Sequence, residues 1–303
     1  MKKPILFLIF NRPDTTKQVF EAIRKYKPKQ LFIAADGPRN KGESEICKET
    51  RSVVSNIDWD CDVKTLFREE NLGCRDAVSS SIDWFFQNVE SGIILEDDCL
   101  PNQSFFRFCE EMLKMYRNNK KIKHINGTNY LEEFREEIEG KYFFSRLFFV
   151  WGWATWRDRW LKYDKDFNIN KFNNYKIDQK NNLILKLFHK TNIKYNIHLV
   201  KTNTWGVQWS SKCFAENGIS CTPVKNLIRN IGEEGTHTSG DSTFVNKKTH
   251  MENFDTIEKK NEIKSNLKLD KIQYKRIGLL KHIVSYHMYF IPIKIKRFVK
   301  KHD

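Results

Sequence analysis

Short apolar runs alternate with amphipathic segments through the first part of the chain. The runs are rich in β-branched and aromatic residues, which is typical of buried strands, whereas the segments between them repeat apolar residues at helical spacing. This alternation predicts an α/β domain built on a mostly parallel sheet that helices cover. The expected strands span residues 5–10, 31–35, 62–67 and 93–95, and the expected helices span residues 14–26, 43–56, 74–88 and 102–117.

The pattern changes in the second part, where aromatic and small residues gather in KYFFSRLFFVWGWATWRDRW, residues 141–160. This segment predicts a strand up to Val150 and a helix from Ala154. We further expect an Asn- and Lys-rich excursion at residues 165–182, a helix at 205–216, a strand at 220–224 and a helical pattern from 277. The whole predicts one α/β domain, residues 1–250, followed by a basic, amphipathic, helical extension, residues 251–303.

Three consecutive acids, Glu96, Asp97 and Asp98, follow the fourth expected strand, although the chain has 53 Lys and Arg against 38 Asp and Glu. Adjacent carboxylates repel one another, and this raises the pKa of at least one of them unless a cation lies between them. Mn²⁺ and Mg²⁺ suit such oxygen-rich, incomplete sites. The acids therefore favour a metal site over the alternative, a solvated acidic turn.

Other strand ends carry groups that suit a nucleotide. Ligands of parallel α/β sheets bind beyond the carboxyl ends of the strands. Arg12 follows the first strand and suits a phosphate or a base, and Asp36 follows the second and suits ribose hydroxyls or a base. Arg75, at the start of a helix, could add positive charge. Each residue alone is explained as well by a plain turn or a solvated side chain; together with the acids they favour a nucleotide site.

Composition and charge narrow the class of protein. The seven cysteines are odd in number and show no C-x-x-C pair or zinc spacing, which indicates a reducing compartment. The apolar run at residues 5–10 is shorter than a secretory signal requires. We therefore expect a cytoplasmic protein. The net charge of +15, concentrated toward the C-terminus, predicts peripheral contact with an anionic membrane; a helix docked on the main domain is the alternative.

Six segments occur in an order that resembles the GT-A nucleotide-sugar glycosyltransferases. They are PILFLIFNRP, FIAADGPR, ENLGCRDAV, GIILEDDCLPNQSFFRF, FFVWGWATWRDRW and ISCTPVKNLIRNIGEEGTHT. The set, within residues 4–238, is similar to N-acetylglucosaminyltransferase I and to related bacterial polysaccharide glycosyltransferases. The resemblance implies a GT-A (Rossmann-like) fold. It also implies a hexosyltransferase that moves a sugar from a nucleotide donor, a UDP-sugar, to a glycan or lipid-linked glycan acceptor in bacterial surface polysaccharide biosynthesis.

The resemblance also implies roles for individual residues. Asp98 becomes the last carboxylate of a variant DxD motif, which holds Mn²⁺ or Mg²⁺. Glu96 and Asp97 would support the metal, the ribose or the sugar hydroxyls. Arg12 and Asp36 match the arginine and the aspartate that contact the nucleotide in this family.

A later aromatic turn and a loop complete the implied site. Trp151, Gly152 and Trp153 resemble the aromatic-glycine turn that lines the donor sugar, although an aromatic core strand is the alternative. His237 would be a second metal ligand or a donor to the diphosphate, on a loop that closes over the nucleotide.

The catalytic base is where the chain departs from the family. Inverting relatives carry a carboxylate between two tryptophans, and here Trp205 and Trp209 enclose no acid. Another acid, a different stereochemistry or weak catalysis would each account for this difference. The candidate bases are Glu216 and Glu234, with Glu233, Asp241 and Asp158 as further possibilities.

Two other functions are compatible with part of the pattern. A nucleotidyltransferase that makes sugar nucleotides shares the sheet and the acids, but it needs a Gly-rich phosphate loop after the first strand, where NRPDTTKQ has no glycine. A non-catalytic basic protein that binds membranes or nucleic acid would explain the charge and leave the acids unexplained. We therefore expect no nucleic-acid partner.

Overall fold

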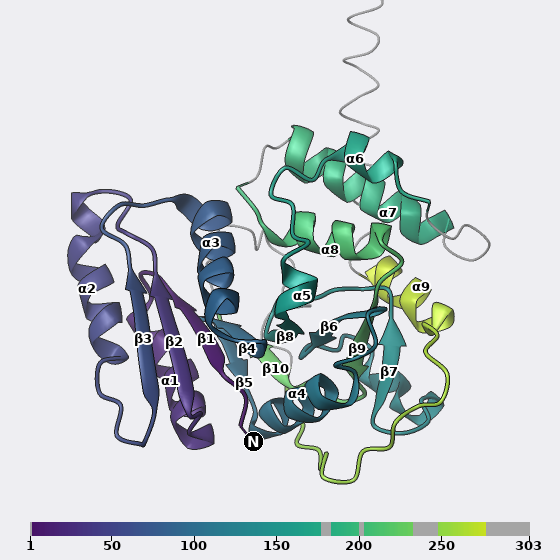
Figure 1. Ribbon diagram of the computed structural model, residues 1–303, viewed down its shortest axis with the longest axis horizontal. Helices are drawn as coiled ribbons and strands as arrows, with labels where there is room; N and C mark the ends of the chain where they lie inside the picture. Colours follow the sequence, from purple (N-terminus) through teal and green to yellow (C-terminus); the bar gives the residue numbers. More distant parts are fainter. Residues whose placement is uncertain (1, 177–182, 200–202, 233–247, 277–303) are drawn as a thin grey trace, which may run out of the picture.

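The computed structural model describes residues 2–176, 183–199, 203–232 and 248–276, and it is built on one mixed sheet (Figure 1). The strands of this sheet, in spatial order, are β3 (Asp62–Phe67), β2 (Gln30–Ala35), β1 (Ile5–Ile9), β4 (Ser91–Glu96), β8 (Trp153–Trp156), β6 (Ile122–Asn126), β9 (Ile219–Pro223) and β7 (Tyr142–Ser145). The parallel strands β1 to β4 form one half of the sheet.

The other half of the sheet is mixed. β8 lies antiparallel between β4 and β6. β6 and β9 are parallel to each other, and β7 is antiparallel at the edge. All strands except β8 and β7 therefore run in one direction, and their carboxyl ends lie at the same edge of the sheet.

Helices cover both faces of the sheet because side chains of successive strand residues point to opposite sides. In β1, Ile5, Phe7 and Ile9 join one apolar cluster, and Leu6 and Leu8 join the other. The first face is covered by α1 (Pro13–Tyr26), α2 (Ser44–Val53) and α4 (Gln103–Met115). The second is covered by α3 (Gly73–Asn88), α5 (Arg157–Trp160), α6 (Ile169–Asn173), α7 (Leu183–Ile193), α8 (Gly206–Ala215) and α9 (Leu267–Arg276).

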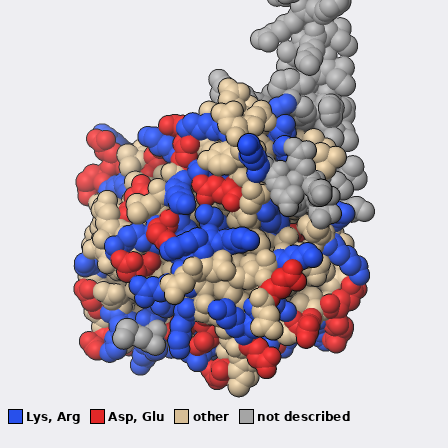
Figure 2. Space-filling model, turned by 45° about the vertical axis from the view of Figure 1, so that its right-hand side comes forward, with Lys and Arg blue, Asp and Glu red and all other residues tan. Residues whose placement is uncertain are grey.

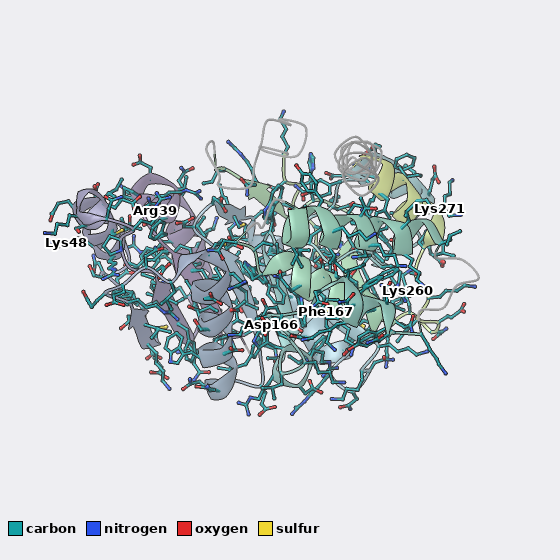
Figure 3. The ribbon with its side chains drawn as sticks, turned by 90° about the horizontal axis from the view of Figure 1, so that it is seen from above. Arg39, Lys48, Asp166, Phe167, Lys260 and Lys271 are labelled. Carbon is teal, nitrogen blue, oxygen red and sulfur yellow. The ribbon has the colours of Figure 1, made fainter. Side chains whose placement is uncertain are left out.

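Figure 1 shows α1 and α2 beside the parallel half of the sheet. In the same view α6, α7 and α8 lie together above the mixed half. Figure 3, seen from above, places Arg39 and Lys48 at one end of the molecule and Lys260 and Lys271 at the opposite end. The predicted fold class, a Rossmann-like α/β sheet covered by helices, is confirmed.

The first half of the chain follows the sequence prediction closely, and the second half departs from it. Ala154 was expected in a helix, but it lies in β8, where it pairs with Ile93 and Ile125 in the middle of the sheet. Neither β6 nor α7 was predicted. β6 escaped notice because its sequence, IKHIN, is largely polar although the strand is buried. The helical pattern from Ile277 lies outside the described residues.

The described part of the predicted extension packs on the main domain. The ring of Phe254 lies 4.9 Å from that of Phe108 in α4. In α9, the buried carboxylate of Asp270 accepts hydrogen bonds from the Ser145 hydroxyl at 2.5 Å and the Arg146 amide at 3.0 Å. The described residues 248–276 thus pack against the same core. Within the described residues, no helix is both long enough and apolar enough to cross a bilayer.

One glycine is required both by its backbone and by its neighbours. Gly152 has a φ of +62°, a region that L side chains rarely adopt, and an added Cβ would lie 2.4 Å from the Ile228 Cδ1 atom. Gly140 has a comparable φ of +77°, but an added Cβ there would meet only the Lys260 ammonium, at 3.9 Å. Comparing substitutions at Gly140 and Gly152 therefore distinguishes the effect of backbone strain from that of steric overlap.

We expect Gly140→Ala to lower the free energy of unfolding by about 1 kcal/mol, because only the backbone is strained. Gly152→Ala should lower it by at least about 3 kcal/mol, because overpacking against Ile228 is added to the same strain. Chemical denaturation of both variants measures the difference. Equal losses would show that the packing around Gly152 is looser than described.

Candidate functional site

The three acids lie where β4 leaves the sheet, beside the end of β1. The buried Asp97 carboxylate accepts hydrogen bonds from the Phe10 amide at 3.1 Å and from the Arg12 guanidinium at 3.3 Å. The same Arg12 nitrogen lies 3.0 Å from the Asp98 Oδ2 atom. Arg12 immediately precedes α1, so the end of β1 supplies a cation to the end of β4.

The negative charge of the three acids exceeds the positive charge of the groups around them. Burial, then the charges of Asp98 and Asp97, raises the pKa of Glu96 to about 8. Burial, then the charge of Asp98, raises the pKa of Asp97 to about 7, although Arg12 opposes this shift. This cluster therefore favours any further cation that reaches it.

A short ribbon brings a late part of the chain against Asp98. β5 (Cys99–Pro101) pairs antiparallel with β10 (Ile228–Asn230), and the Ile231 amide donates to the Asp98 carbonyl at 2.8 Å. The Asn230 side chain holds the Gly232 amide at 3.0 Å. A Cβ added to Gly232 would lie 2.7 Å from Asp98 Oδ2. Only a glycine therefore lets the chain pass this close to the carboxylate.

The arrangement of the acids can be compared with the coordination that the predicted ions, Mn²⁺ or Mg²⁺, require. Within the described ranges, no three side chains of His, Cys, Asp and Glu are placed to hold a metal ion together. Hard cations of this kind also bind through one or two carboxylates, with water and phosphate oxygens completing the shell. Asp98 and the surplus of negative charge fit such an incomplete site. Metal binding itself remains a prediction.

Asp36 caps a helix in this structure. One carboxylate oxygen accepts from the Gly37 and Leu72 amides and the other from the Gly73 amide, each at 3.0 Å. These bonds satisfy backbone donors at the start of α3, as a capping carboxylate does. The side chain thus fixes the corner between β2 and α3. The nucleotide contact predicted for Asp36 remains a prediction.

Cys74, which the sequence analysis did not single out, lies between the ends of β2 and β4. Burial, then the charges of Glu96 and Asp36, raises the pKa of its thiol to about 12, and Asp98 adds to the effect. Charges act in this way only at short range inside a protein. The structure therefore brings Asp36, Glu96 and Asp98 to one edge, near this thiol.

Arg75 pairs with its own neighbour. Its guanidinium lies 3.1 Å from the Asp76 carboxylate. Its backbone amide donates to the Asn203 side chain at 3.0 Å, so Asn203, which precedes α8, also caps α3. The predicted contribution of Arg75 to a phosphate pocket would require its side chain to leave Asp76.

The N-termini of α1, α3 and α8 all lie at this edge. Trp153 pairs with Ile94, so the antiparallel register places Trp151 level with Glu96. An added Cβ on Gly206, the first residue of α8, would lie 3.3 Å from the Val150 side chain next to Trp151. Helix N-termini carry partial positive charge and free amide donors. The edge therefore combines acids with groups that attract anions.

The aromatic turn is divided between the core and the surface. Trp153 is 0% exposed and stacks on His124, with a ring distance of 4.8 Å. Trp151 is partly exposed and meets Tyr130 edge-to-face at 6.2 Å. Gly152 is buried between them. Trp153 thus belongs to the core, as the alternative interpretation predicted, and Trp151 is the ring of this turn that reaches the surface.

Side chains in β6 and just after it hold the segment that leads into this turn. The Asn126 side chain accepts from the Phe149 amide at 2.8 Å and donates to the Leu147 carbonyl at 3.1 Å. The Thr128 hydroxyl donates to the Trp151 carbonyl at 2.9 Å. These bonds to alternate residues replace the main-chain ladder that a neighbouring strand would provide.

His124 completes this set. The Trp209 indole donates to its Nδ1 atom at 3.1 Å, so the proton lies on Nε2, which donates to the Phe149 carbonyl at 2.8 Å. Burial lowers the pKa of His124 to about 3, and the ring is neutral. The sequence analysis missed these residues because nothing in IKHIN distinguishes polar side chains that bind backbone from polar side chains in solvent.

Glu216 lies at the other end of the sheet. It pairs with Lys123 at 3.0 Å and with Lys212. Burial raises its pKa, but the hydrogen bonds from these lysines outweigh burial and leave it below the ordinary value. Through the pairing of β4, β8 and β6, Lys123 is level with Ser91, five residues before Glu96, or about 16 Å along a strand. Glu216 therefore lies far from the acids, and its assignment as the base stays a prediction that this distance does not favour.

None of the other predicted bases is described near the acids. Asp158 pairs with Lys120 and Arg159, near the same far end. Glu233, Glu234, Asp241 and His237 lie outside the described residues.

Comparisons with known proteins give distant structural similarities. No protein-family model and no curated protein sequence matches the chain. HddC from Yersinia pseudotuberculosis has 7% identity and a TM-score of 0.34, over 55% of this chain and 82% of that chain. A UDP-glucose pyrophosphorylase complexed with UDP-glucose has 10% identity and a TM-score of 0.36, over 77% and 94%. Mouse xyloside xylosyltransferase 1 has 8% identity and a TM-score of 0.35, over 71% and 81%.

The raised pKa of Glu96 predicts a pH-dependent stability. In the absence of divalent metal, the folded protein keeps a proton on this carboxyl that the unfolded chain releases near its ordinary pKa of 4.5. The contribution of Glu96 to stability is therefore full below pH 4.5 and is lost as the pH rises through about 8.

Glu96→Gln, which is neutral at every pH, removes this loss. At pH 8.5 we expect its melting temperature to exceed that of the wild type by about 2–4 °C. Near pH 4 the two proteins should melt together. Thermal melts across this range, with chelator present, measure the difference; a difference that is independent of pH would contradict the buried-carboxyl assignment.

Proposed function

We propose that this protein transfers a sugar from a nucleotide donor, a UDP-sugar, to a glycan or lipid-linked glycan acceptor, with the help of Mn²⁺ or Mg²⁺. The observation that carries the proposal is the cluster of three carboxylates and Arg12 at the carboxyl edge of the sheet. That edge is where α/β folds of this type bind their ligands. The order of motifs that resembles GT-A glycosyltransferases adds the reaction type.

Each residue of the cluster has a role in this proposal. Asp98, which lies beside Arg12 at the end of β4, would hold the metal. A bound divalent ion offsets the charge that develops on a departing nucleoside diphosphate. Arg12 adds a fixed positive charge, and Asp97 keeps it in place through their hydrogen bond. Glu96, whose raised pKa favours the protonated form, could donate a hydrogen bond to a sugar or ribose oxygen.

Groups around the cluster would orient the donor. The N-termini of α1 and α8 suit the phosphates. Trp151 offers a partly exposed aromatic face to a pyranose ring, and the Thr128 hydroxyl, just after β6, holds the Trp151 carbonyl. Glu234 lies outside the described residues, and we keep it as a proposed base. His237 remains the proposed donor to the diphosphate.

The rival function is that of a nucleotidyltransferase, which needs the same sheet and acids. Such enzymes hold their triphosphate on a Gly-rich loop after the first strand. Here β1 ends at Ile9 and α1 begins at Pro13 without an intervening glycine. This short connection favours the transfer of a sugar. The proposed setting is polysaccharide assembly at the cytoplasmic membrane face.

A panel of nucleotide sugars, incubated with the wild type and with Asp98→Ala, tests the proposal. We expect Mn²⁺-dependent release of nucleoside diphosphate from at least one donor. Asp98→Ala should slow this release by about 100-fold or more, because several kcal/mol of charge stabilisation are lost. The matched control is Asp60→Ala, which removes an exposed acid paired only with Lys29 and should behave as the wild type.

Two results would contradict the proposal. If no nucleotide sugar binds or reacts, the donor assignment fails. If nucleoside triphosphate and a sugar 1-phosphate instead give pyrophosphate, the protein is a nucleotidyltransferase. Unchanged metal dependence in Asp98→Ala would remove only the metal assignment.

A further inference from the structure

α7 exposes apolar side chains to solvent on its outer face. Leu183 is 74% exposed and Leu187 is 48% exposed. The two residues are four positions apart, so they lie one above the other on the same side of the helix. The opposite side is buried: Leu185 and Phe188 pack in the second apolar cluster. The outer leucines are therefore not needed for the core.

Lysines share this outer face. At 100° per residue, Lys186 and Lys190 fall within about 60° of Leu183 around the helix axis. Leucine and lysine thus alternate along one face, while the inner face is apolar.

No acid offsets these lysines within a long stretch of sequence. Between Asp178 and Glu216 the chain contains no aspartate or glutamate. In contrast, α1 and α2 carry acidic residues beside their basic ones. The upper part of Figure 2, where α6 and α7 lie, shows neutral surface with Lys and Arg side chains around it. The face is both apolar and positively charged.

We propose that the outer face of α7 lies on an anionic lipid bilayer, with Leu183 and Leu187 inserted among the lipids and with Lys186 and Lys190 at the headgroups. Leucines can enter the acyl boundary while lysine stems extend back to the phosphates. Nucleic acid would satisfy the lysines but would leave the leucines in water. Two leucines are too few for the core of a stable protein–protein interface.

The α7 face connects to the candidate site through α8. His189 of α7 lies 3.3 Å from the Ser211 hydroxyl of α8, and its ring stacks on Phe214 at 4.2 Å. The first turn of α8 lies at the edge that holds the acids. A bilayer under α7 would therefore lie beside the helix that borders the site. The membrane contact itself does not depend on the proposed transfer reaction.

Co-sedimentation of the full chain with lipid vesicles tests this proposal. We expect tighter binding to vesicles of phosphatidylcholine and phosphatidylglycerol in equal parts than to phosphatidylcholine alone, and weaker binding as salt increases. The double variant Leu183→Glu, Leu187→Glu should bind the anionic vesicles at least about tenfold more weakly. Both side chains are exposed, so its melting temperature should match that of the wild type.

The matched control is Ile46→Glu, on α2. Ile46 is 39% exposed, and α2 carries Lys48, which lies at the opposite end of the molecule from Lys271 of α9. Since α9 packs beside α7 through the contact of Tyr274 with Phe188, at 4.4 Å, this control changes a remote surface. We expect it to bind vesicles as the wild type does.

A second variant separates charge from apolar contact. Lys186→Gln, Lys190→Gln should reduce the salt dependence of vesicle binding while leaving the leucines in place. The proposal is overturned if the leucine variant binds as well as the wild type, since the basic C-terminal sequence would then account for binding. It is also overturned if wild-type binding is the same on both kinds of vesicle, or if the chain prefers duplex DNA to anionic vesicles. Donor hydrolysis in solution, unaffected by either variant, keeps this result separate from the test of the transfer reaction.

Discussion

The crowding of three carboxylates at the end of β4 is the constraint on which this edge of the molecule depends. Asp97 is buried, and burial opposes the charged form of both Asp97 and Glu96. Positive groups offset part of this charge. Arg12 from the end of β1 bridges two of the acids, and the N-termini of three helices face the same edge. Parallel strands make this possible, because each delivers its carboxyl end, and the helix that follows it, to one place.

A second polar arrangement, buried inside the sheet, supports the first. Asn126 and His124 project from β6 and bind both the amide and the carbonyl of Phe149. Each bond is made in a dry environment, where an unmet donor or acceptor is costly. The segment before β8 is thereby held in one conformation although no strand pairs with it. Precise placement at the edge thus depends on residues that never reach the surface.

The sequence predicted those features that depend on local pattern. Apolar runs located β1, β2 and β4 because buried parallel strands are continuously apolar, and the acids after β4 stood out for the same reason. Features that depend on partners far away in the chain escaped prediction. Glu216 looked like a free carboxylate until its two lysines placed it at the wrong end of the sheet, and Asp36 showed no sign that three amides would occupy it. β6 was not predicted because its polar side chains bind backbone carbonyls of residues that are distant in sequence and that only the tertiary fold brings near.

The position of β8 has a consequence for how the chain folds. β4 and β6 are consecutive strands of the main sheet along the chain, yet β8 lies between them and pairs with both. The parallel half can assemble as soon as residue 96 is available, but its β4 edge stays unpaired until the chain has extended to Trp156. During synthesis a ribosome-bound intermediate therefore displays an open apolar strand edge for some sixty residues of elongation, which at typical rates lasts about 3–12 s. In that interval edge-to-edge association competes with folding, and a chaperone that shields this edge would raise the yield of native protein.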